Sequence, residues 1–581
     1  MVSIEDLKNL DTTKFTTAAD SWSAASNRAG EAKRRVDSVL GTLAATQKGK
    51  AATSVLSRLA RLSRNYQYIH AECGMIRTAL SGLAEELAGP QQKLKHALED
   101  AEALKFTVRK DGSVDYPRDP STPAPLLPTP AVPGKPSLLK PSGNQDKAQG
   151  IADRIGTALQ EAAEIDGRYA KVLAKLKADP SLDKTDWLDV AQDMKDLRAA
   201  AGKHFSEAGI PKGKSAKENA EWWERRSQAE KDEYLALYPE RIGALDGLPS
   251  SVRDAANRVV LAEGHAETKQ QLDDWIERKP DEEYERRTRG EWRVRPEWNS
   301  WREERDRIKE KLEGIKAIEA RLAQPTGTDG LPEAYLLGFD TKGNGHAIVA
   351  NGNPDTATNT AVYVPGTYSK LAGAEGDVKR MTDLWRAVHA LPGSPEASTI
   401  TWIGYDAPQS IVPQAMNKSY AHAGAPKLND FLDGLQTVQG GADKSHTTII
   451  GHSYGSTTVG DASLKGKLAA DDIIVAGSPG VLVNDAGKLD VGKDHVWSEA
   501  ASDDDVPLGG KIAGLGEPKR IGPDEDGRIS YKHVVPSDKE FGGHRMKVDT
   551  SGHSKYWTPD SLSLQNQAVV VAGMYDRVVE E

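Results

Sequence analysis

The sequence predicts an α/β protein in which a mostly parallel β-sheet is flanked by helices and preceded by long α-helical segments. From residue 332 onward, short apolar runs rich in β-branched residues alternate with helical stretches, as in parallel sheets with helical crossovers. Residues 1–104 and 144–325 are instead rich in Ala, Leu, Arg, Lys and Glu at helical spacing. The stretch TTIIGHSYGST at residues 447–457 joins an apolar run directly to a run of small residues. These three observations together define the predicted class.

The predicted strands follow one another through the C-terminal part of the chain. Seven runs qualify, namely AYLLGFD, HAIVANG, AVYVPGT, TITWIGYD, TTIIGHS, DDIIVAGS and HVWSEA. After them, the segment that begins RMKVDTSGH predicts a short strand, a loop and a C-terminal helix. Helical stretches lie between several of the runs, so we expect helices on both faces of the sheet.

A proline-rich segment divides the helical part of the chain. Residues 1–116 predict a helical hairpin or bundle with a short β-hairpin, because two alternating runs flank the turn sequence KDG. Residues 117–143 predict an extended, semi-rigid linker because of their many prolines. Residues 144–325 predict an α-helical accessory domain, and residues 326–581 form the predicted α/β domain.

Composition and charge exclude several classes of protein. A chain of 581 residues is too long for one hydrophobic core, and its net charge of −10 argues against a general nucleic-acid binder. The single cysteine, Cys73, allows neither an internal disulfide nor a cysteine-based zinc site. Because no His-Glu-x-x-His pattern or acidic calcium loop occurs, we expect no metal and no cofactor.

The N-terminus lacks the basic start and apolar core of a cleaved signal peptide. No window approaches the roughly 18 apolar residues that a membrane helix needs. We therefore expect no stable membrane insertion and a cytoplasmic location by default. Export without a cleavable signal peptide, by a type VII-like route, is the alternative.

Ser453 is the candidate nucleophile. It lies between two glycines in GHSYG, where a strand over residues 447–451 turns into a helix over about residues 456–468. The pattern predicts a nucleophile elbow, a sharp turn that lifts the serine hydroxyl above the sheet. Glycines are needed on both sides because side chains there would strike the neighbouring strand or helix.

An acid and a histidine follow Ser453 in the order that such an elbow requires. The acidic run ASDDDVP comes directly after the predicted strand HVWSEA, and its candidate acids are Asp503, Asp504 and Asp505. His553, in the loop before the C-terminal helix, is the candidate base, and His544 is the fallback. A carboxylate beside the imidazole would fix its tautomer and stabilise the imidazolium.

The candidate oxyanion donors are the backbone N–H groups of Thr367 and Tyr454. Thr367 follows an early strand, where Gly366 permits close backbone approach, and Tyr454 directly follows the nucleophile. The predicted chemistry is acyl transfer, in which Ser453 attacks a carbonyl, His553 moves the proton and water releases the acyl group.

The C-terminal part resembles the actinobacterial α/β-hydrolase family, a former domain of unknown function that is distantly similar to cutinases and lipases. The matching segments, in chain order, are GNPDTATNTAVYVPGT, WIGYDAP, IIGHSYGSTTVG, VAGSPGV, DDDVP and GHSKYW. With a helical lead-in, the resemblance spans about residues 215–575. It implies an α/β-hydrolase fold and a Ser-Asp-His triad, and so names a reaction class. We expect residues 326–581 to form the catalytic domain and the substrate to be a small-molecule or lipid-like ester.

The resemblance also selects among the acids. The family's Asn-Asp-Pro-Val segment lies over residues 503–506, which implies Asp504 as the triad acid. Asp505 stands where the family has proline, so Asp505 stays an alternative. The family pattern His-Ser-x-Tyr lies over residues 553–556 and supports His553 as the base.

The N-terminal helices resemble, more loosely, the WXG-type helical hairpins of specialised secretion systems. Trp22 lies in SWSA, and Tyr68 and Glu72 have the Tyr-x-x-x-acid spacing that those systems recognise. The simpler interpretation is a helical bundle with a core tryptophan. The resemblance keeps a second function open, a non-catalytic or effector-type interaction protein that uses a hydrolase-fold scaffold and binds a protein partner through these helices.

Two further segments carry expectations. In YERRTRGEWRVRPEWNSWREERDR, interspersed glutamates favour a salt-bridged helix that packs its tryptophans on the hydrolase domain over a nucleic-acid surface. Residues 507–543 are rich in Gly, Pro and charge and predict a mobile flap beside the site or an ordinary surface insertion. Their polarity argues against an apolar interfacial lid.

Overall fold

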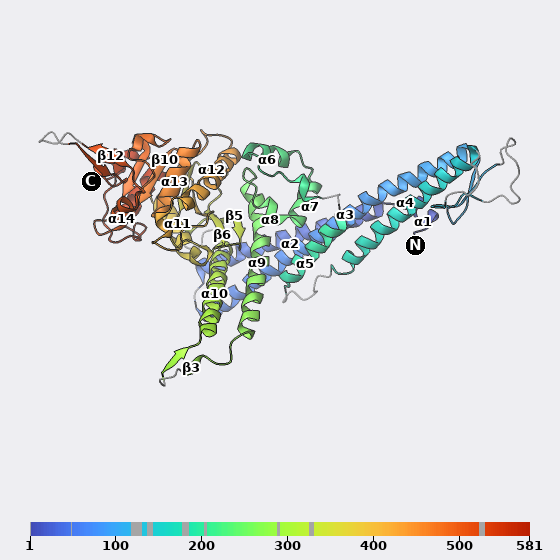
Figure 1. Cartoon of the computed structure of the whole chain (residues 1–581), viewed down its shortest axis with the longest axis horizontal. Coiled ribbons are helices and arrows are strands. Elements are labelled where there is room, and N and C mark those ends of the chain that lie inside the picture. Colours follow the sequence, from blue (N-terminus) through green and yellow to red (C-terminus); the bar gives the residue numbers. More distant parts are fainter. Residues whose placement is uncertain are drawn as a thin grey trace. The chain divides into compact units, whose positions relative to one another are not determined.

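The computed structural model describes residues 2–47, 49–117, 130–135, 143–176, 185–202, 206–286, 291–324, 330–521 and 529–581, and Figure 1 labels its elements. The chain forms two compact units. The first comprises Met1–Lys33, Leu62–Ile210 and Asp232–Leu237, and the second comprises Arg34–Arg61, Pro211–Lys231 and Tyr238–Glu581. Most of the predicted linker at 117–143 lies outside the described residues. The division into four regions made from the sequence stays a prediction.

Helices, most of them long, dominate the first 200 residues. They are α1 (Ile4–Lys8), α2 (Thr13–Thr46), α3 (Lys50–Ala103), α4 (Gly143–Leu173) and α5 (Trp187–Ala201). The turn sequence KDG lies in the predicted hairpin, which pairs β1 (Thr107–Val108) with β2 (Val114–Asp115) in antiparallel register. Among the described residues, no helix combines the length and apolar character needed to cross a membrane.

Helix α4 shows why these segments pack as a bundle. Its apolar residues recur every three or four positions and form one buried stripe, made of Ile151, Ile155, Ala158, Ala162, Ile165 and Tyr169. Tyr68 and Glu72 of α3 are also buried. In this structure the Tyr-x-x-x-acid pair is therefore enclosed within the first unit.

Residues 211–323 contribute further helices and one hairpin. The helices are α6 (Ala216–Glu224), α7 (Gln228–Leu237), α8 (Pro239–Ile242), α9 (Ser250–Glu277) and α10 (Pro296–Ala323). The hairpin pairs β3 (Tyr284–Arg286) with β4 (Trp292–Val294). Apolar residues of α9 and α10, including Leu261 and Ile315, pack with Leu336 and Val349 at the antiparallel end of the main sheet.

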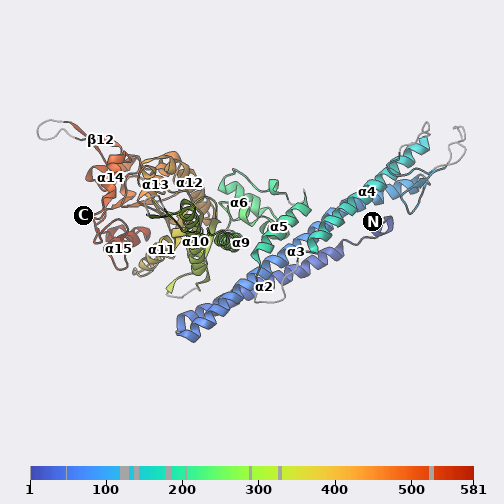
Figure 2. The ribbon, with the colours of Figure 1, turned by 60° about the horizontal axis from the view of Figure 1, so that its bottom comes forward.

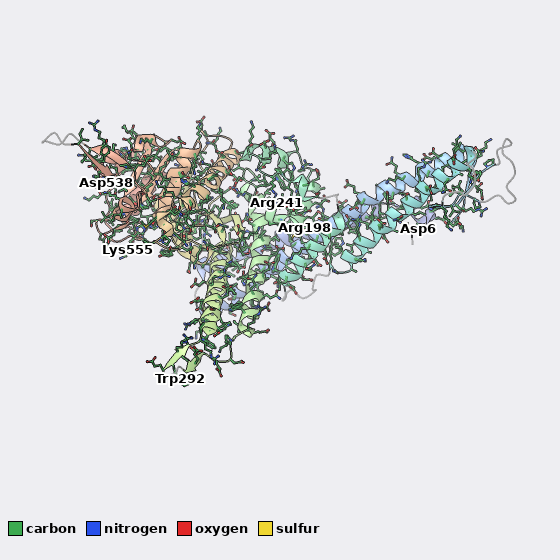
Figure 3. All side chains as sticks on the ribbon, viewed as in Figure 1. Asp6, Arg198, Arg241, Trp292, Asp538 and Lys555 are labelled. Atoms are coloured by element: carbon green, nitrogen blue, oxygen red, sulfur yellow. The ribbon has the colours of Figure 1, made fainter. Side chains whose placement is uncertain are left out.

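The Trp-rich segment differs from its prediction. Trp292 lies in β4 and is exposed (Figure 3), because the first part of the segment forms a hairpin rather than a helix. Trp301 is buried, and its indole N–H donates to the Trp275 carbonyl of α9 at 2.9 Å. Trp298 packs under the Lys279 ammonium, 5.1 Å from the ring centre. The two tryptophans of α10 thus pack on α9.

The main sheet has eight strands in the order β14-β11-β10-β9-β7-β8-β6-β5. Only β6 is antiparallel to its neighbours; the other neighbouring pairs are parallel. The strands are β5 (Ala334–Asp340), β6 (His346–Asn351), β7 (Asn359–Val364), β8 (Ala397–Ile403), β9 (His446–His452), β10 (Asp472–Ala476), β11 (Val496–Glu499) and β14 (His544–Arg545). All seven runs predicted as strands lie in this sheet, and the short strand predicted from Arg545 onward overlaps β14 at Arg545 alone.

Helices cover both faces of the sheet, as the alternating pattern predicted (Figure 2). On one face, α12 (Ser419–Gln439) and α13 (Tyr454–Lys465) pack against side chains that include Ile449. On the other face, α11 (Ala374–His389) and α15 (Leu562–Val571) pack against side chains that include Ile450. Consecutive strand residues point to opposite faces, so an apolar run can fill both cores at once.

The segment between the candidate acid and the candidate base contains α14 (Val506–Ala513) and a hairpin of β12 (Pro518–Ile521) and β13 (Ser530–His533). Short 3-10 helices complete the described part of the chain: η1 (Glu207–Gly209), η3 (Leu371–Gly373), η4 (Gln414–Met416), η5 (Ala486–Lys488), η6 (Lys493–His495), η7 (Lys539–Phe541) and η8 (Tyr575–Arg577). The carboxyl ends of the parallel strands meet at one edge of the sheet, where ligands bind in open α/β sheets.

Candidate active site

Ser453 lies on a sharp turn between β9 and α13. Its backbone has φ 54° and ψ −131°, a conformation that non-glycine residues adopt only at a cost of about 1–3 kcal/mol. The Ser453 N–H donates to the Ala476 carbonyl at the end of β10, at 3.0 Å. A Cβ on Gly451 would lie 2.6 Å from Ser456 Cα, and one on Gly455 would lie 2.1 Å from the Val364 oxygen. Both glycines are therefore required for steric reasons, as predicted from the sequence.

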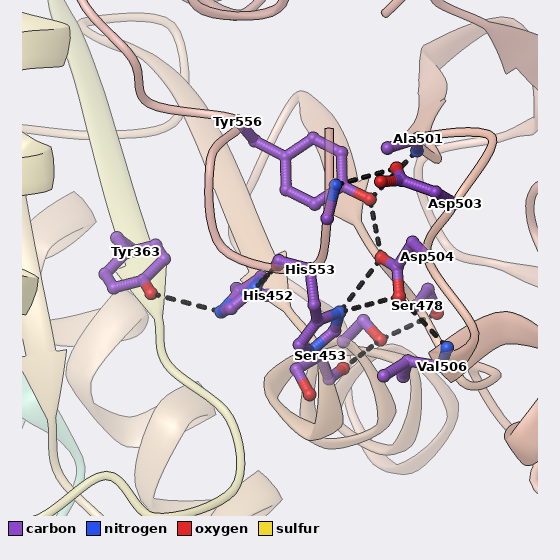
Figure 4. A network of polar contacts seen from close by, with 12 residues as sticks. Tyr363, His452, Ser453, Ser478, Ala501, Asp503, Asp504, Val506, His553 and Tyr556 are labelled. Atoms are coloured by element: carbon purple, nitrogen blue, oxygen red, sulfur yellow. Dashed lines mark hydrogen bonds and ion pairs between the residues drawn. The ribbon is translucent and has the colours of Figure 1, made fainter. Parts of the chain in front are cut away.

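Asp504 and His553 come together at the same edge of the sheet, on the segments that follow β11 and β14 (Figure 4). The His553 Nδ1 lies 2.9 Å from Asp504 Oδ2 and 3.0 Å from Oδ1. The Asp504 side chain is fully buried, whereas His553 is partly exposed. With Nδ1 facing the carboxylate, Nε2 has no hydrogen-bond partner among the described residues. Figure 4 shows Ser453 beside this imidazole.

Two more donors hold the Asp504 carboxylate. The Tyr556 hydroxyl donates to Oδ2 at 2.6 Å, and the Val506 N–H donates to Oδ1 at 3.0 Å. Burial alone would raise the pKa of Asp504, but the hydrogen bonds from His553, Tyr556 and Val506 outweigh it and keep the pKa below its ordinary value. Asp504 is therefore ionised at neutral pH and can stabilise a positive charge on His553.

The other candidates occupy different places. Asp503 accepts the Gly552 N–H at 2.7 Å and so fixes the loop that carries His553. Asp505 is the N-cap of α14. His544 lies in the edge strand β14, where it contacts Glu580 at 2.9 Å and stacks on Trp497 with ring centres 4.2 Å apart. Of these acids and histidines, the structure pairs Asp504 with His553.

His452, the residue before Ser453, contacts the loop that carries His553. Its Nε2 lies 2.8 Å from the His553 carbonyl oxygen, and the two imidazoles stack with centres 4.8 Å apart. Burial, followed by the nearby Arg380 charge, lowers the pKa of His452 to about 3. The ring is therefore neutral at neutral pH, and Nε2–H is the donor to the carbonyl.

A buried polar network continues from His452 into the domain. The Tyr363 hydroxyl lies 3.5 Å from His452 Nδ1 (Figure 4), and Arg380 donates to that hydroxyl at 2.6 Å and to Asp377 at 2.8 Å. Sequence reasoning assigned no role to His452 or Tyr556. Both lie in the motifs that carried the resemblance, directly before the nucleophile and three positions after His553.

The loop after β7 brings backbone close to the nucleophile. A Cβ on Gly366 would lie 2.5 Å from Ser453 Cβ and 2.9 Å from Tyr454 N, so this loop touches the elbow. The Thr367 and Tyr454 N–H groups have no acceptor among the described residues. Tyr368 follows with φ 69°, and its N–H donates to the Pro408 carbonyl at 2.7 Å. That bond anchors the loop next to Ser453.

No three His, Cys, Asp or Glu side chains group into a metal-binding cluster in the part of the chain that the structure describes. The geometry at the sheet edge is a serine on a strained turn, an imidazole–carboxylate pair, and two unengaged backbone donors. This combination of fold and site defines the α/β-hydrolase class.

Comparison with known proteins gives the same class. Residues 340–513 match the model of the alpha/beta hydrolase family. Together with the eight-stranded sheet and its flanking helices, this match shows that the C-terminal part of the chain has the α/β-hydrolase fold. The expected fold class is confirmed, whereas the WXG-type resemblance of the N-terminal helices stays a prediction.

Similar proteins occur in mycobacteria. Uncharacterized protein Rv2079 of Mycobacterium tuberculosis is 29% identical over 406 residues, which cover 64% of this chain and 58% of that protein. The chain thus spans somewhat more than half the length of this relative. Uncharacterized protein Rv0963c of the same organism is 28% identical over 207 residues, which cover 34% of this chain and 74% of that protein.

Two solved structures are also similar. A predicted CIB-like hydrolase from Thermoplasma acidophilum aligns with a TM-score of 0.26 at 16% identity, over 42% of this chain and 98% of its own. The esterase LipW from Mycobacterium marinum aligns with a TM-score of 0.25 at 10% identity, over 46% of this chain and 88% of its own.

Proposed function

We propose that the protein is a serine hydrolase that cleaves a carboxylic ester through Ser453, His553 and Asp504. The observation that carries the proposal is the contact of 2.9 Å between His553 Nδ1 and the buried Asp504 carboxylate, beside a serine held at φ 54°. The substrate class is a small-molecule or lipid-like ester.

The reaction proceeds by acyl transfer. The Ser453 oxygen attacks the ester carbonyl while its proton passes to His553 Nε2, and Asp504 stabilises the imidazolium. The tetrahedral intermediate collapses, the C–O bond to the alcohol breaks, and His553 returns the proton to the leaving alcohol. Water then attacks the acyl-serine by the same route and releases a carboxylic acid, so the enzyme returns to its starting state.

The Thr367 and Tyr454 N–H groups stabilise the negative charge on the carbonyl oxygen. Both groups adjoin Ser453 through the close approach of Gly366 to Tyr454 N. Tyr454 is the first residue of α13, so the positive end of that helix dipole adds to the stabilisation. Removing one such donor in other enzymes costs about 10²–10³ in kcat.

A fluorophosphonate probe tests the proposal, because it reacts covalently with activated serines. We expect the wild-type protein to be labelled and Ser453→Ala to lose the label. Ser554→Ala is the matched control, since Ser554 is an exposed serine in the loop next to His553; it should keep the label. A folded wild-type protein that takes no label would favour the alternative, a non-catalytic scaffold that binds a protein partner.

A further inference from the structure

We propose that exposed apolar side chains on segments anchored to the candidate active site bind the surface of an aggregated, water-insoluble acyl ester, a lipid–water interface. The inference deepens the proposed hydrolase function and rests on it for the identity of the substrate. The side chains concerned, which we call the apolar rim, are Tyr368, Ile411, Val412, Met416, Leu508 and Ile512. They are between 43% and 78% exposed.

The apolar rim concentrates the exposed hydrophobic surface of its domain. Six of the ten exposed large hydrophobic side chains within the described residues of 330–581 belong to it. Scattered exposed hydrophobics are ordinary on soluble proteins, whereas a group of them marks a site of interaction. The rim residues lie on two segments, and each segment is bonded directly to groups of the candidate active site.

The first segment is the stretch after β8, residues 404–418, together with Tyr368. Near its start, the Pro408 carbonyl accepts the Tyr368 N–H, next to the oxyanion donor Thr367. At its other end, the Asn417 carbonyl accepts a hydrogen bond from the side-chain hydroxyl of Tyr454, whose backbone N–H is the other candidate oxyanion donor. Ile411, Val412 and Met416 lie between these two anchors. The segment that carries them is therefore anchored at both ends to residues of the oxyanion region.

The second segment is α14, which starts directly after the candidate acid. Val506 donates to Asp504, and Gly510 packs so tightly on Pro479 that a Cβ there would lie 1.8 Å from the Pro479 oxygen. Leu508 and Ile512 are four residues apart, so they share one helix face, and that face is exposed. Beyond the helix, Leu515 packs with Tyr454.

The stretches that carry the rim residues hold little charge of their own. Residues 410–417 contain no charged side chain. The only charged residue of α14, Lys511, is paired with Asp538 at 2.6 Å. Burying apolar side chains against another apolar surface removes them from water and is favourable without further contacts.

The position of the rim selects the occupant. A protein partner or a second copy of the chain seated on both segments would cover Ser453 and close the site. An aggregate of the substrate can cover the apolar rim and still supply Ser453 with ester molecules. The molecules that contact the apolar side chains are then the ones that react. The sequence prediction for residues 507–543 missed this because their average polarity hides the single apolar face of α14.

Partition onto vesicles tests the inference without relying on catalysis. The protein is the full chain carrying Ser453→Ala, and the probe is a suspension of phosphatidylcholine vesicles that contain trioleoylglycerol. In this background we replace four rim residues together, as Ile411→Ser, Val412→Ser, Leu508→Ser and Ile512→Ser. We expect the fraction of protein that floats with vesicles to require at least about tenfold more lipid after the four substitutions.

A matched control removes two exposed hydrophobics that lie off the rim, Leu464→Ser and Val579→Ser, and should float like the parent. Circular dichroism and a cooperative thermal transition check that the fourfold variant is folded. If it is not, Ile512→Ser alone replaces it and should show a severalfold loss. Equal partition of parent and rim variant, or loss of self-association in place of vesicle binding, would overturn the proposal.

The two proposals fail separately. Absence of fluorophosphonate labelling on the wild-type protein contradicts the hydrolase, whereas vesicle binding by the Ser453→Ala chain does not depend on an active serine. If the wild-type protein is labelled but the Ser453→Ala chain does not bind vesicles, the proposed hydrolase function stands and the apolar rim is not a lipid-binding surface.

Discussion

Replacing Tyr556 by Phe removes the hydroxyl that is hydrogen-bonded to Asp504 in the Asp504–His553 pair. That hydroxyl donates to Asp504 Oδ2 at 2.6 Å and accepts the Ala501 N–H at 3.0 Å. Burial and the bond to Asp504 raise the pKa of Tyr556 well above its ordinary value, so the hydroxyl stays protonated and is a donor. A hydrogen bond to a charged group contributes about 1.5–3 kcal/mol.

Loss of the Tyr556 hydroxyl makes the ionised form of Asp504 less stable. Because the Tyr556 hydrogen bond favours the ionised carboxylate, its removal makes the Asp504–His553 pair easier to protonate. The acid limb of the kcat/KM profile should therefore move to higher pH by about one unit, since one pKa unit corresponds to 1.36 kcal/mol. At pH 7 we expect kcat/KM to fall about tenfold.

The assay measures kcat/KM for p-nitrophenyl butyrate over pH 5–9, together with urea unfolding at pH 7. The matched control is Tyr575→Phe, because the Tyr575 hydroxyl donates to Asp472 Oδ2 at 2.7 Å. Asp472 begins β10, at the opposite end of that strand from the site. We expect each variant to lose about 2 kcal/mol of stability and only Tyr556→Phe to change the pH profile. An unshifted acid limb in Tyr556→Phe would refute the reasoning.

Two further predictions concern the oxyanion loop and the buried histidine. In Gly366→Ala the new Cβ would lie 2.5 Å from Ser453 Cβ and 2.9 Å from Tyr454 N, so the loop must move away from the nucleophile. We expect kcat to fall about 100-fold in a stopped-flow ester assay. An unchanged kcat would show that the loop is not part of the site. The pKa of His452 is about 3 in the folded chain and about 6.5 in an unfolded one, so the unfolded chain binds more protons between these pH values. The stability that His452 contributes is therefore complete above pH 6.5 and is lost at about 1.4 kcal/mol per pH unit as the pH falls toward 3. The difference in stability between the wild type and His452→Gln, measured by urea unfolding at several pH values, should change with this slope, and a constant difference would contradict it.

The parts of the fold that depend on local pattern were predictable. Apolar runs of four to seven residues gave the strands of the main sheet, since strands buried on both faces carry continuous apolar side chains. GHSYG gave the elbow, because the glycines meet local steric demands at Ser456 and Val364. The spatial order of the strands was not predictable from these runs, because β7 and β8 exchange places in the sheet relative to their order in the chain.

The site was predictable where chain order carries the information. Residue type and chain order narrowed the acid to Asp503, Asp504 or Asp505 and favoured His553 over His544, and the family resemblance implied Asp504. His452 acts through the His553 carbonyl, 101 positions away, and Tyr556 acts through Asp504, 52 positions away. Neither contact leaves a local pattern. The hairpins β3–β4 and β12–β13 were also missed, because their strands are short and polar.

Mapping the acyl group tests the central claim most directly. The protein is incubated with p-nitrophenyl butyrate, quenched with acid during turnover, and digested for tandem mass spectrometry. The account predicts a butyryl group on the peptide that contains Ser453, localised to that serine, and no turnover in Ser453→Ala. Turnover that persists in Ser453→Ala, or an acyl group located on another residue, would contradict it.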